Sequence, residues 1–251
     1  MAKKFIAYFD YLGYKEFILN NSSDHLKTRA GHILRDIEIS LGQGKYLPLQ
    51  HGAIVADLSS TRINCLNISD TVIFWTNDDS IESLEELLLV AYEFNWREIL
   101  YSFPVRGIIC YDEMEMISSQ QKNMAGAIYS PNLIYGKGLV QAHLKADNLS
   151  WAGSVVDETV IEQIKDKVDI PSFLSPFAKL YTAPYKNPEI YGNAEEYTLN
   201  LIKGDLDKES FNNVEQGIIA AFRNDNKSID NPRVQEILKN TIVYLKTYLS
   251  I

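Results

Sequence analysis

The sequence predicts an α+β domain with a ferredoxin-like βαββαβ core, in which an antiparallel sheet carries helices on one face, with extra helices at the C-terminus. The order of apolar runs and amphipathic segments along the first half of the chain indicates this core. The bulk composition agrees, because 46% of the 251 residues are hydrophobic and 23% are charged, as in ordinary globular proteins. No apolar run is long enough to span a bilayer, so no membrane partner is expected.

The first elements are a buried strand and a long amphipathic helix. Lys4–Phe9 is almost wholly apolar, and Leu12–Gly13 turns the chain into a helix over Tyr14–Leu41. The cluster Asn20–Asp24 is typical of a helix cap and predicts a break in that helix. A further strand or hairpin arm is predicted over Ala53–Leu58.

A hairpin, a helix and a strand complete the core. Arg62–Ile68 and Thr71–Trp75 are rich in β-formers and are joined by a short polar turn. The polar residues after Trp75 cap a helix over Ile81–Tyr101. Val105–Tyr111, introduced by a proline, is the next strand.

The second half of the chain continues with shorter elements. It is predicted to hold a loop or hairpin over Asp112–Ala125, strands over Ala127–Tyr129, Trp151–Val156 and Tyr197–Ile202, helices over Gly136–Ala146 and Asp157–Val168, and an irregular segment over Pro171–Pro188. We expect one main domain over residues 1–203. Residues 204–251 form a helical extension packed on it, with amphipathic helices over Asp205–Arg223 and Pro232–Leu249.

Charge and cysteine content exclude several classes of function. The net charge of −9 argues against binding to nucleic acid, which needs a basic surface, but is compatible with a nucleotide substrate. Cys65 and Cys110 stand in apolar strand-like runs and are expected to be buried thiols of a cytoplasmic protein. An acidic residue, Asp10, interrupts the N-terminal apolar stretch, so a first strand is expected there and not a signal peptide.

Two aspartates at the ends of buried-looking strands are the strongest chemical signal. Asp10 follows the first strand and Asp70 lies at the hairpin turn. Taken singly, Asp10 could cap the next helix and Asp70 could serve the turn. The β-α-β-β order, however, places the hairpin tip beside the end of the first strand. Two such carboxylates, with the main-chain carbonyl of Tyr11, suit Mg²⁺ or Mn²⁺, and the helix start at Gly13 presents N–H groups to phosphate.

Three further side chains could complete a site. Arg106 stands inside an apolar strand and needs an anion, either a ligand or a structural ion-pair partner. Gln141 and Lys145 are four residues apart and share a helix face, although a solvated surface position is the common fate of a lysine. The four histidines are scattered, and no phosphate-loop, dinucleotide-binding or nucleophile-elbow motif is present.

Together these residues resemble the class III nucleotide cyclase family, in particular its small stand-alone bacterial pyrimidine cyclases of the Pycsar antiphage systems. The resemblance runs from residue 5 to about residue 156, and its order and spacing are more specific than any single motif. The matching segments are Phe9–Gly13, Ser69–Val72, Val105–Gly107 and Gly136–Lys145.

The resemblance implies a palm-type cyclase homology domain and a two-metal mechanism. Asp10, Asp70 and the carbonyl of Tyr11 would hold two divalent ions, Mn²⁺ or Mg²⁺, against the triphosphate, and the ribose 3′-hydroxyl would attack the α-phosphorus and expel pyrophosphate. Leu12, Gly13 and Arg106 would contact the phosphates. In the family an Asn and an Arg of the partner subunit assist catalysis.

Here Gln141 and Lys145 occupy the positions of that Asn and Arg. Lysine supplies charge without the fork of arginine. The resemblance therefore implies a homodimer with two shared active sites.

The resemblance also indicates which nucleotide base the substrate carries. Adenine-selective relatives use a Lys before the second metal Asp and an Asp before the glycine-containing helix. Leu66 or Asn67 and Ile134 stand there instead, which disfavours ATP and favours a pyrimidine. The prevalence of UTP in the family then favours UTP, with CTP as the alternative, and Asn67 could pair with either base. The expected activity is conversion of UTP to cyclic UMP, a messenger for a downstream receptor in antiphage defence.

Two other functions stay open. One is a non-catalytic cyclase-like domain that binds a nucleotide or a partner protein. The other is a different palm-domain enzyme, such as a diguanylate cyclase, although the hairpin tip Ser69–Asp70 does not match the Gly-Gly-Asp-Glu-Phe hairpin of that class.

Overall fold

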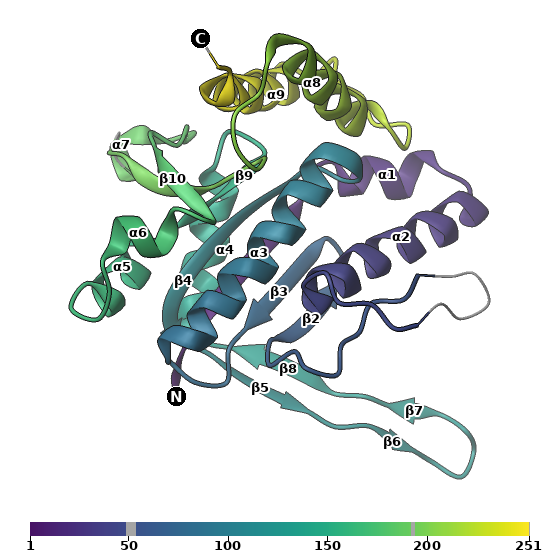
Figure 1. Ribbon diagram of the computed structural model, residues 1–251. Coiled ribbons are helices and arrows are strands. Elements are labelled where there is room, and N and C mark those ends of the chain that lie inside the picture. The colour runs from purple at the N-terminus through teal and green to yellow at the C-terminus, as the bar shows by residue number, and fades with distance from the viewer. Residues whose placement is uncertain (49–53, 192–193, 251) are drawn as a thin grey trace.

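A seven-stranded mixed sheet forms the centre of the computed structural model, which describes residues 1–48, 54–191 and 194–250 (Figure 1). Within these residues the strand order is β10-β11-β9-β4-β1-β3-β2. The strands are β1 (Lys3–Tyr11), β2 (Asn64–Ile68), β3 (Thr71–Trp75), β4 (Val105–Glu113), β9 (Gly153–Val156), β10 (Ala178–Tyr181) and β11 (Glu196–Leu199).

Helices and a long hairpin surround this sheet. The helices are α1 (Tyr14–Asn20), α2 (Ser23–Gly42), α3 (Ile81–Tyr101), α4 (Lys137–Asn148), α5 (Glu158–Ile164), α6 (Ile170–Leu174), α7 (Pro188–Tyr191), α8 (Lys208–Arg223) and α9 (Pro232–Leu245), with a 3₁₀ turn at Lys246–Tyr248. The hairpin projects away from the sheet and consists of β5 (Glu115–Ser118), β6 (Gln121–Lys122), β7 (Ile128–Tyr129) and β8 (Asn132–Tyr135).

The predicted ferredoxin-like core is confirmed. β1 lies between β4 and β3, both antiparallel to it, and β2 pairs antiparallel with β3. The sheet is not antiparallel throughout, because β9 adds to β4 in a parallel direction before β11 and β10 continue antiparallel.

A later helix, α4, which follows the ferredoxin-like core, covers the face of the sheet opposite the core helix α3. Successive residues of a strand point to opposite faces. Phe9 of β1 packs on Phe94 of α3, whereas the neighbouring Tyr8 bonds through its hydroxyl to His143 of α4, 3.0 Å away. The two helices therefore cover opposite faces, because the chain leaves β4 through the hairpin and returns behind the sheet (Figure 1).

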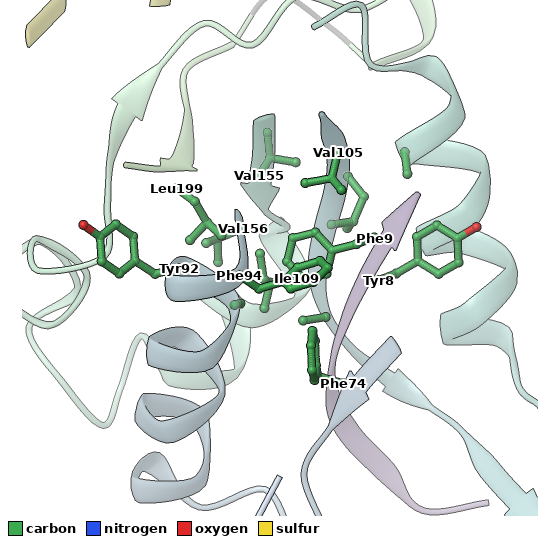
Figure 2. Close-up of a cluster of buried hydrophobic side chains, with 14 of the residues drawn as sticks. Tyr8, Phe9, Phe74, Tyr92, Phe94, Val105, Ile109, Val155, Val156 and Leu199 are labelled. Atoms are coloured by element: carbon green, nitrogen blue, oxygen red, sulfur yellow. The ribbon is translucent and has the colours of Figure 1, made fainter. Parts of the chain in front are cut away.

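The main core lies between the sheet and α3. Phe9, Phe74 and Phe94 are fully buried and meet edge to face, with ring centroids 4.9 to 6.1 Å apart. Figure 2 shows these rings beside Ile109, while Tyr8 points to the other side. Because both faces of β1 are covered, its sequence is a continuous apolar run and not an alternating one.

Most predicted elements lie where the sequence indicates. The long first helix breaks at Asn21 and restarts as α2 with Ser22 as its cap, and the predicted bounds of α3 agree with the structure. The predicted helix from Asp157 stops at Ile164. The predicted strand Ala53–Leu58 begins outside the described residues, and its remainder forms one bridge, Ala56 with Tyr46.

The segment Pro171–Pro188, predicted to be irregular, contains α6 and the edge strand β10. Its short strand between prolines has no periodicity of its own and exists because it pairs with β11. Cys110 is buried as expected and Cys65 only partly, and both thiols are free.

The C-terminal helix α9 packs against the end of the central sheet. Tyr244 of α9 is fully buried, and its hydroxyl lies 2.8 Å from the hydroxyl of Thr198 on β11. Thr241 accepts a hydrogen bond from the backbone N–H of Ala152, at 2.8 Å. In the described part of the chain, no helix is long and apolar enough to cross a membrane.

Candidate active site

One cavity of about 350 Å³ brings together residues that are far apart in the sequence. Asp10 is opposite Thr71 on one side and Arg106 on the other, and the backbone N–H of Tyr11 donates to the carbonyl of Asp70 at 2.8 Å. The register of the sheet therefore places both aspartates at the same end of the neighbouring strands β1 and β3. Six residues predicted from the sequence line the cavity: Asp10, Tyr11, Leu12, Gly13, Asp70 and Arg106.

Asp10 is a desolvated carboxylate with one oxygen engaged. Its Oδ2 accepts from Nε and Nη2 of Arg106, at 3.0 and 2.8 Å. Burial raises the pKa of Asp10 above its ordinary value, Arg106 opposes that shift, and the nearby Asp70 adds to it. Among the described residues, none donates a hydrogen bond to Oδ1, so this oxygen can take a cation.

Arg106 bridges two carboxylates. Of the two alternatives predicted for this arginine, a bound ligand or a structural ion pair, the structure shows the ion pair. Besides Asp10, Arg106 binds Asp147 at the end of α4, through Nη1 to the carbonyl at 2.9 Å and Nη2 to Oδ1 at 2.7 Å. Burial disfavours the charged form of Asp147, yet Arg106 and Lys186 hold the pKa of its carboxyl below the ordinary value. A contact of Arg106 with phosphate stays a prediction.

The turn after β1 forms the floor of the cavity. Gly13 has a left-handed backbone with φ of 80°, which glycine adopts without strain. Leu12 already donates its N–H to the carbonyl of Pro104 at 2.8 Å, so it fixes the turn and offers no free donor. The hydroxyl of Tyr11 donates to Glu98 at 3.3 Å, which leaves the main-chain carbonyl as the group Tyr11 can offer to a metal.

A buried acid supports this turn from behind. Glu98 of α3 is fully buried and accepts hydrogen bonds from the hydroxyl of Tyr11 and from the backbone of Phe103. Burial and the nearby Asp36 raise the pKa of Glu98 to about 8, so the carboxyl is mostly neutral at pH 7.

This acid predicts a pH-dependent stability. Because the pKa of Glu98 is about 8 in the folded chain and its ordinary value is 4.5, the folded state binds more protons between these values. The stabilisation is fully present below pH 4.5 and is lost as the pH rises through 8.

We expect the free energy of unfolding to fall by on the order of a few kcal/mol from pH 5 to 9, measured by urea denaturation. Glu98→Gln, which stays neutral, should flatten this dependence. Glu85→Gln at an exposed position of the same helix should leave it unchanged. An equal slope in the Glu98→Gln variant would contradict the assignment.

Gln141 and Lys145 lie elsewhere. Both line a second cavity, of about 670 Å³, between α4, α5 and β11, which confirms that they share a helix face. Lys145 is not a solvated lysine, because its Nζ pairs with Asp157 at 2.7 Å and with Glu196. Burial alone would lower the pKa of Lys145, but these two carboxylates outweigh it and raise the pKa.

The predicted base-contacting residues are separated. Asn67 is opposite Val72, so it belongs to the face of the sheet away from Asp10, and its amide donates to the carbonyl of Thr71 at 3.2 Å. Ile134 of β8 lines a shallow groove together with Asp70. The structure therefore brings Ile134 into one groove with Asp70 but places Asn67 on the other face of the sheet.

Sequence reasoning missed several charged residues around the cavity. Asp147 completes the contacts of Arg106, and Lys227 and Arg233 of the C-terminal extension form part of the wall. Asp147 ends a helix without any motif, and Lys227 stands in a polar loop. Only the folded arrangement reveals them.

The donors present fit a hard divalent cation. Carboxylate and carbonyl oxygens are the ligands that Mg²⁺ and Mn²⁺ prefer. The described residues contain no group of three or more His, Cys, Asp or Glu that could hold a metal. Asp10 and Asp70 would therefore supply only part of the coordination of an ion, and the remaining oxygens would come from the Tyr11 carbonyl, from water or from a ligand such as a polyphosphate.

Comparisons with known proteins found matches among solved structures only. No protein-family model matches the chain, and no curated protein matches it either. Among solved structures, a dimeric guanylyl cyclase domain of the RhoGC fusion protein from Blastocladiella emersonii has a TM-score of 0.47 at 10% identity, covering 79% of this chain and 96% of that one.

Two further matches are a guanylate cyclase domain and an adenylyl cyclase. The guanylate cyclase domain of RhGC from Catenaria anguillulae, solved with GTP, has a TM-score of 0.45 at 9% identity, covering 79% of this chain and 96% of that one. The adenylyl cyclase CyaB from P. aeruginosa has a TM-score of 0.42 at 13% identity, covering 82% and 98%. These structural neighbours are similar to the chain in their mixed α+β fold.

Proposed function

We propose that the chain is a nucleotide cyclase that converts UTP to 3′,5′-cyclic UMP and pyrophosphate. The observation that carries the proposal is the cavity in which Asp10 and Asp70 converge beside the Gly13 turn. Two carboxylates at the same end of neighbouring strands, beside a glycine turn, suit the triphosphate of a nucleotide and its metal ions.

Each residue of the cavity has a definite part. Asp10, through Oδ1, Asp70 and the carbonyl of Tyr11 would hold two Mg²⁺ or Mn²⁺ ions. When bound, such ions make the 3′-hydroxyl more acidic and neutralise phosphate charge. Arg106 favours the ionised form of Asp10 and holds this side chain in place, and Gly13 would allow the backbone to approach the phosphates.

We further propose a homodimer in which each active site uses residues of both copies. Gln141 and Lys145 line a cavity that shares no lining residue with the Asp10 cavity, so they would serve the site of the other copy. Large apolar side chains are exposed on the hairpin and α4 and could supply the contact area: Ile117, Leu133, Val140 and Leu144.

A pyrimidine base is the proposed specificity. Leu66 is opposite Ile73, which is opposite Tyr8, so Leu66 belongs to the sheet face that carries Asp10. Leu66 and Ile134 offer no charged group to a purine. CTP is the alternative substrate. The cyclic product would act in the cytoplasm as a messenger of antiphage defence through a separate receptor.

The test is a product analysis with each of the four nucleoside triphosphates. The full chain is incubated with Mn²⁺, and the products are identified by mass spectrometry. Cyclic UMP together with pyrophosphate supports the proposal, cyclic CMP supports the alternative substrate, and a purine product would overturn the base assignment.

A non-catalytic nucleotide-binding domain is the second candidate. It is favoured by two observations: Arg106 is engaged by Asp10 and Asp147, and Lys145 is neutralised by carboxylates of its own chain. Binding of a triphosphate without pyrophosphate release from any of the four would favour this candidate over the cyclase.

A further inference from the structure

The C-terminal extension forms one wall of the Asp10 cavity. Residues of the loop between α8 and α9 and of α9 line it opposite the β1 turn, among them Lys227, Ser228 and Arg233. These residues lie more than 200 positions from Gly13 in the sequence. The extension therefore contributes directly to the proposed site and does not only reinforce the main domain.

Lys227 packs directly on the turn at Gly13. A Cβ atom placed on Gly13 would lie 3.0 Å from Cδ of Lys227, so the lysine stem crosses directly over this glycine. The residue is only 8% exposed. Its Nζ lies 3.6 Å from the centroid of the Phe103 ring.

The Lys227 ammonium has no hydrogen-bond acceptor among the residues that the structure describes. A buried cation without such a partner is unfavourable, and a cation–π contact offsets only part of the cost. Burial lowers the pKa of Lys227 to about 8, with Asp225 opposing the shift and Arg29 adding to it. The amine is nevertheless mostly charged at pH 7, so the chain holds an unsatisfied cation at the cavity.

Several contacts hold the loop of Lys227 in this place. Asn21 donates to the carbonyl of Asp225 at 2.7 Å, and Asp225 also pairs with Arg29 at 2.9 Å. The backbone of Ser228 donates to Glu16 of α1 at 2.8 Å. The loop is thus fastened on both sides of Lys227, and the position of the lysine is built into the fold.

We propose that Lys227 and Arg233 bind the terminal phosphates of the substrate, so that the C-terminal extension completes the phosphate site within the same chain. The ammonium would leave the Phe103 ring for a phosphate oxygen at the Gly13 turn, and the exposed Arg233 would approach the same group from the rim. The ligand class, a polyphosphate with a divalent ion, rests on the proposed function.

The experiment measures binding of inorganic triphosphate with Mg²⁺ to the full chain by calorimetry, without any turnover. Lys227→Met keeps the aliphatic stem over Gly13 and removes the charge. We expect it to weaken binding by at least about tenfold, since a charge-assisted contact is lost, while the melting temperature of the free protein stays equal or rises. Lys239→Met, at an exposed position of α9, is the matched control and should change neither quantity.

Arg233→Met provides an independent arm, because Arg233 is exposed and its removal should not impair folding. It should weaken binding about three- to tenfold. Unchanged affinity in Lys227→Met with a lower melting temperature would make Lys227 a structural residue and overturn the proposal. If Lys227→Met does not fold, unchanged affinity in Arg233→Met overturns it.

Failure of the cyclase proposal is a separate result. It would appear as absence of pyrophosphate release from all four nucleotides, while the wild-type chain still binds inorganic triphosphate through Lys227. If the wild-type chain does not bind inorganic triphosphate, the phosphate site proposed here is wrong whatever the nucleotide assay gives.

Discussion

Asp70→Asn is expected to reduce pyrophosphate release from UTP by on the order of 10³-fold or more, because an amide cannot replace a carboxylate as a ligand of a hard cation. The fold should survive the change. Asp70 and Asp10 line the same cavity, and the charge of Asp70 raises the pKa of Asp10, so its neutralisation relieves a repulsion. The measurement is a pyrophosphate assay with Mn²⁺, with the melting temperature recorded alongside. Asp166→Asn, an exposed aspartate between α5 and α6, is the control.

The same variant tests the shared active sites. Asp70→Asn and Gln141→Ala should each be inactive, because each damages both sites of a homodimer. After mixing and subunit exchange, half of the dimers are mixed and each mixed dimer keeps one intact site, so about a quarter of the wild-type activity should return. No recovery from two variants that both form dimers would show that Asp70 and Gln141 do not act across two copies.

The meeting of Asp10 and Asp70 could be predicted because it depends on strand order. Three consecutive strands of a ferredoxin-like core leave little freedom, and the register follows from apolar runs that must face a core. Arg106 was predictable for the same reason, since it is opposite Asp10 on the neighbouring strand. Local pattern and topology together determine this part of the site.

The remaining parts of the site depend on packing over long sequence distances. Asp147 reaches Arg106 only because α4 covers the face of the sheet opposite α3. The local sequence does not determine which face of a sheet a helix covers. Lys227 reaches Gly13 because its loop docks on α1 and α2 through side chains of Asn and Asp. Polar contacts of this kind leave no periodic pattern in the sequence, so they could not be predicted from it.

Arg106→Met should destabilise the chain by about 3–5 kcal/mol, the range for breaking a buried ion pair from one side. Arg106 is 9% exposed and is shared between Asp10 and Asp147, so its removal leaves two carboxylates without their common partner. Urea denaturation at pH 7 measures the loss. Arg62→Met, which breaks the more exposed pair with Glu86, is the control and should cost less than about 1 kcal/mol.

A double variant separates charge from packing at Arg106. Adding Asp10→Asn to Arg106→Met removes one of the two stranded charges, so part of the lost stability should return even though another native group is gone. If the double variant is less stable than Arg106→Met by the full cost of Asp10→Asn alone, the two residues are not coupled. Coupling would mean that Arg106 keeps Asp10 ionised against its burial, which a carboxylate must be before it can bind a divalent cation.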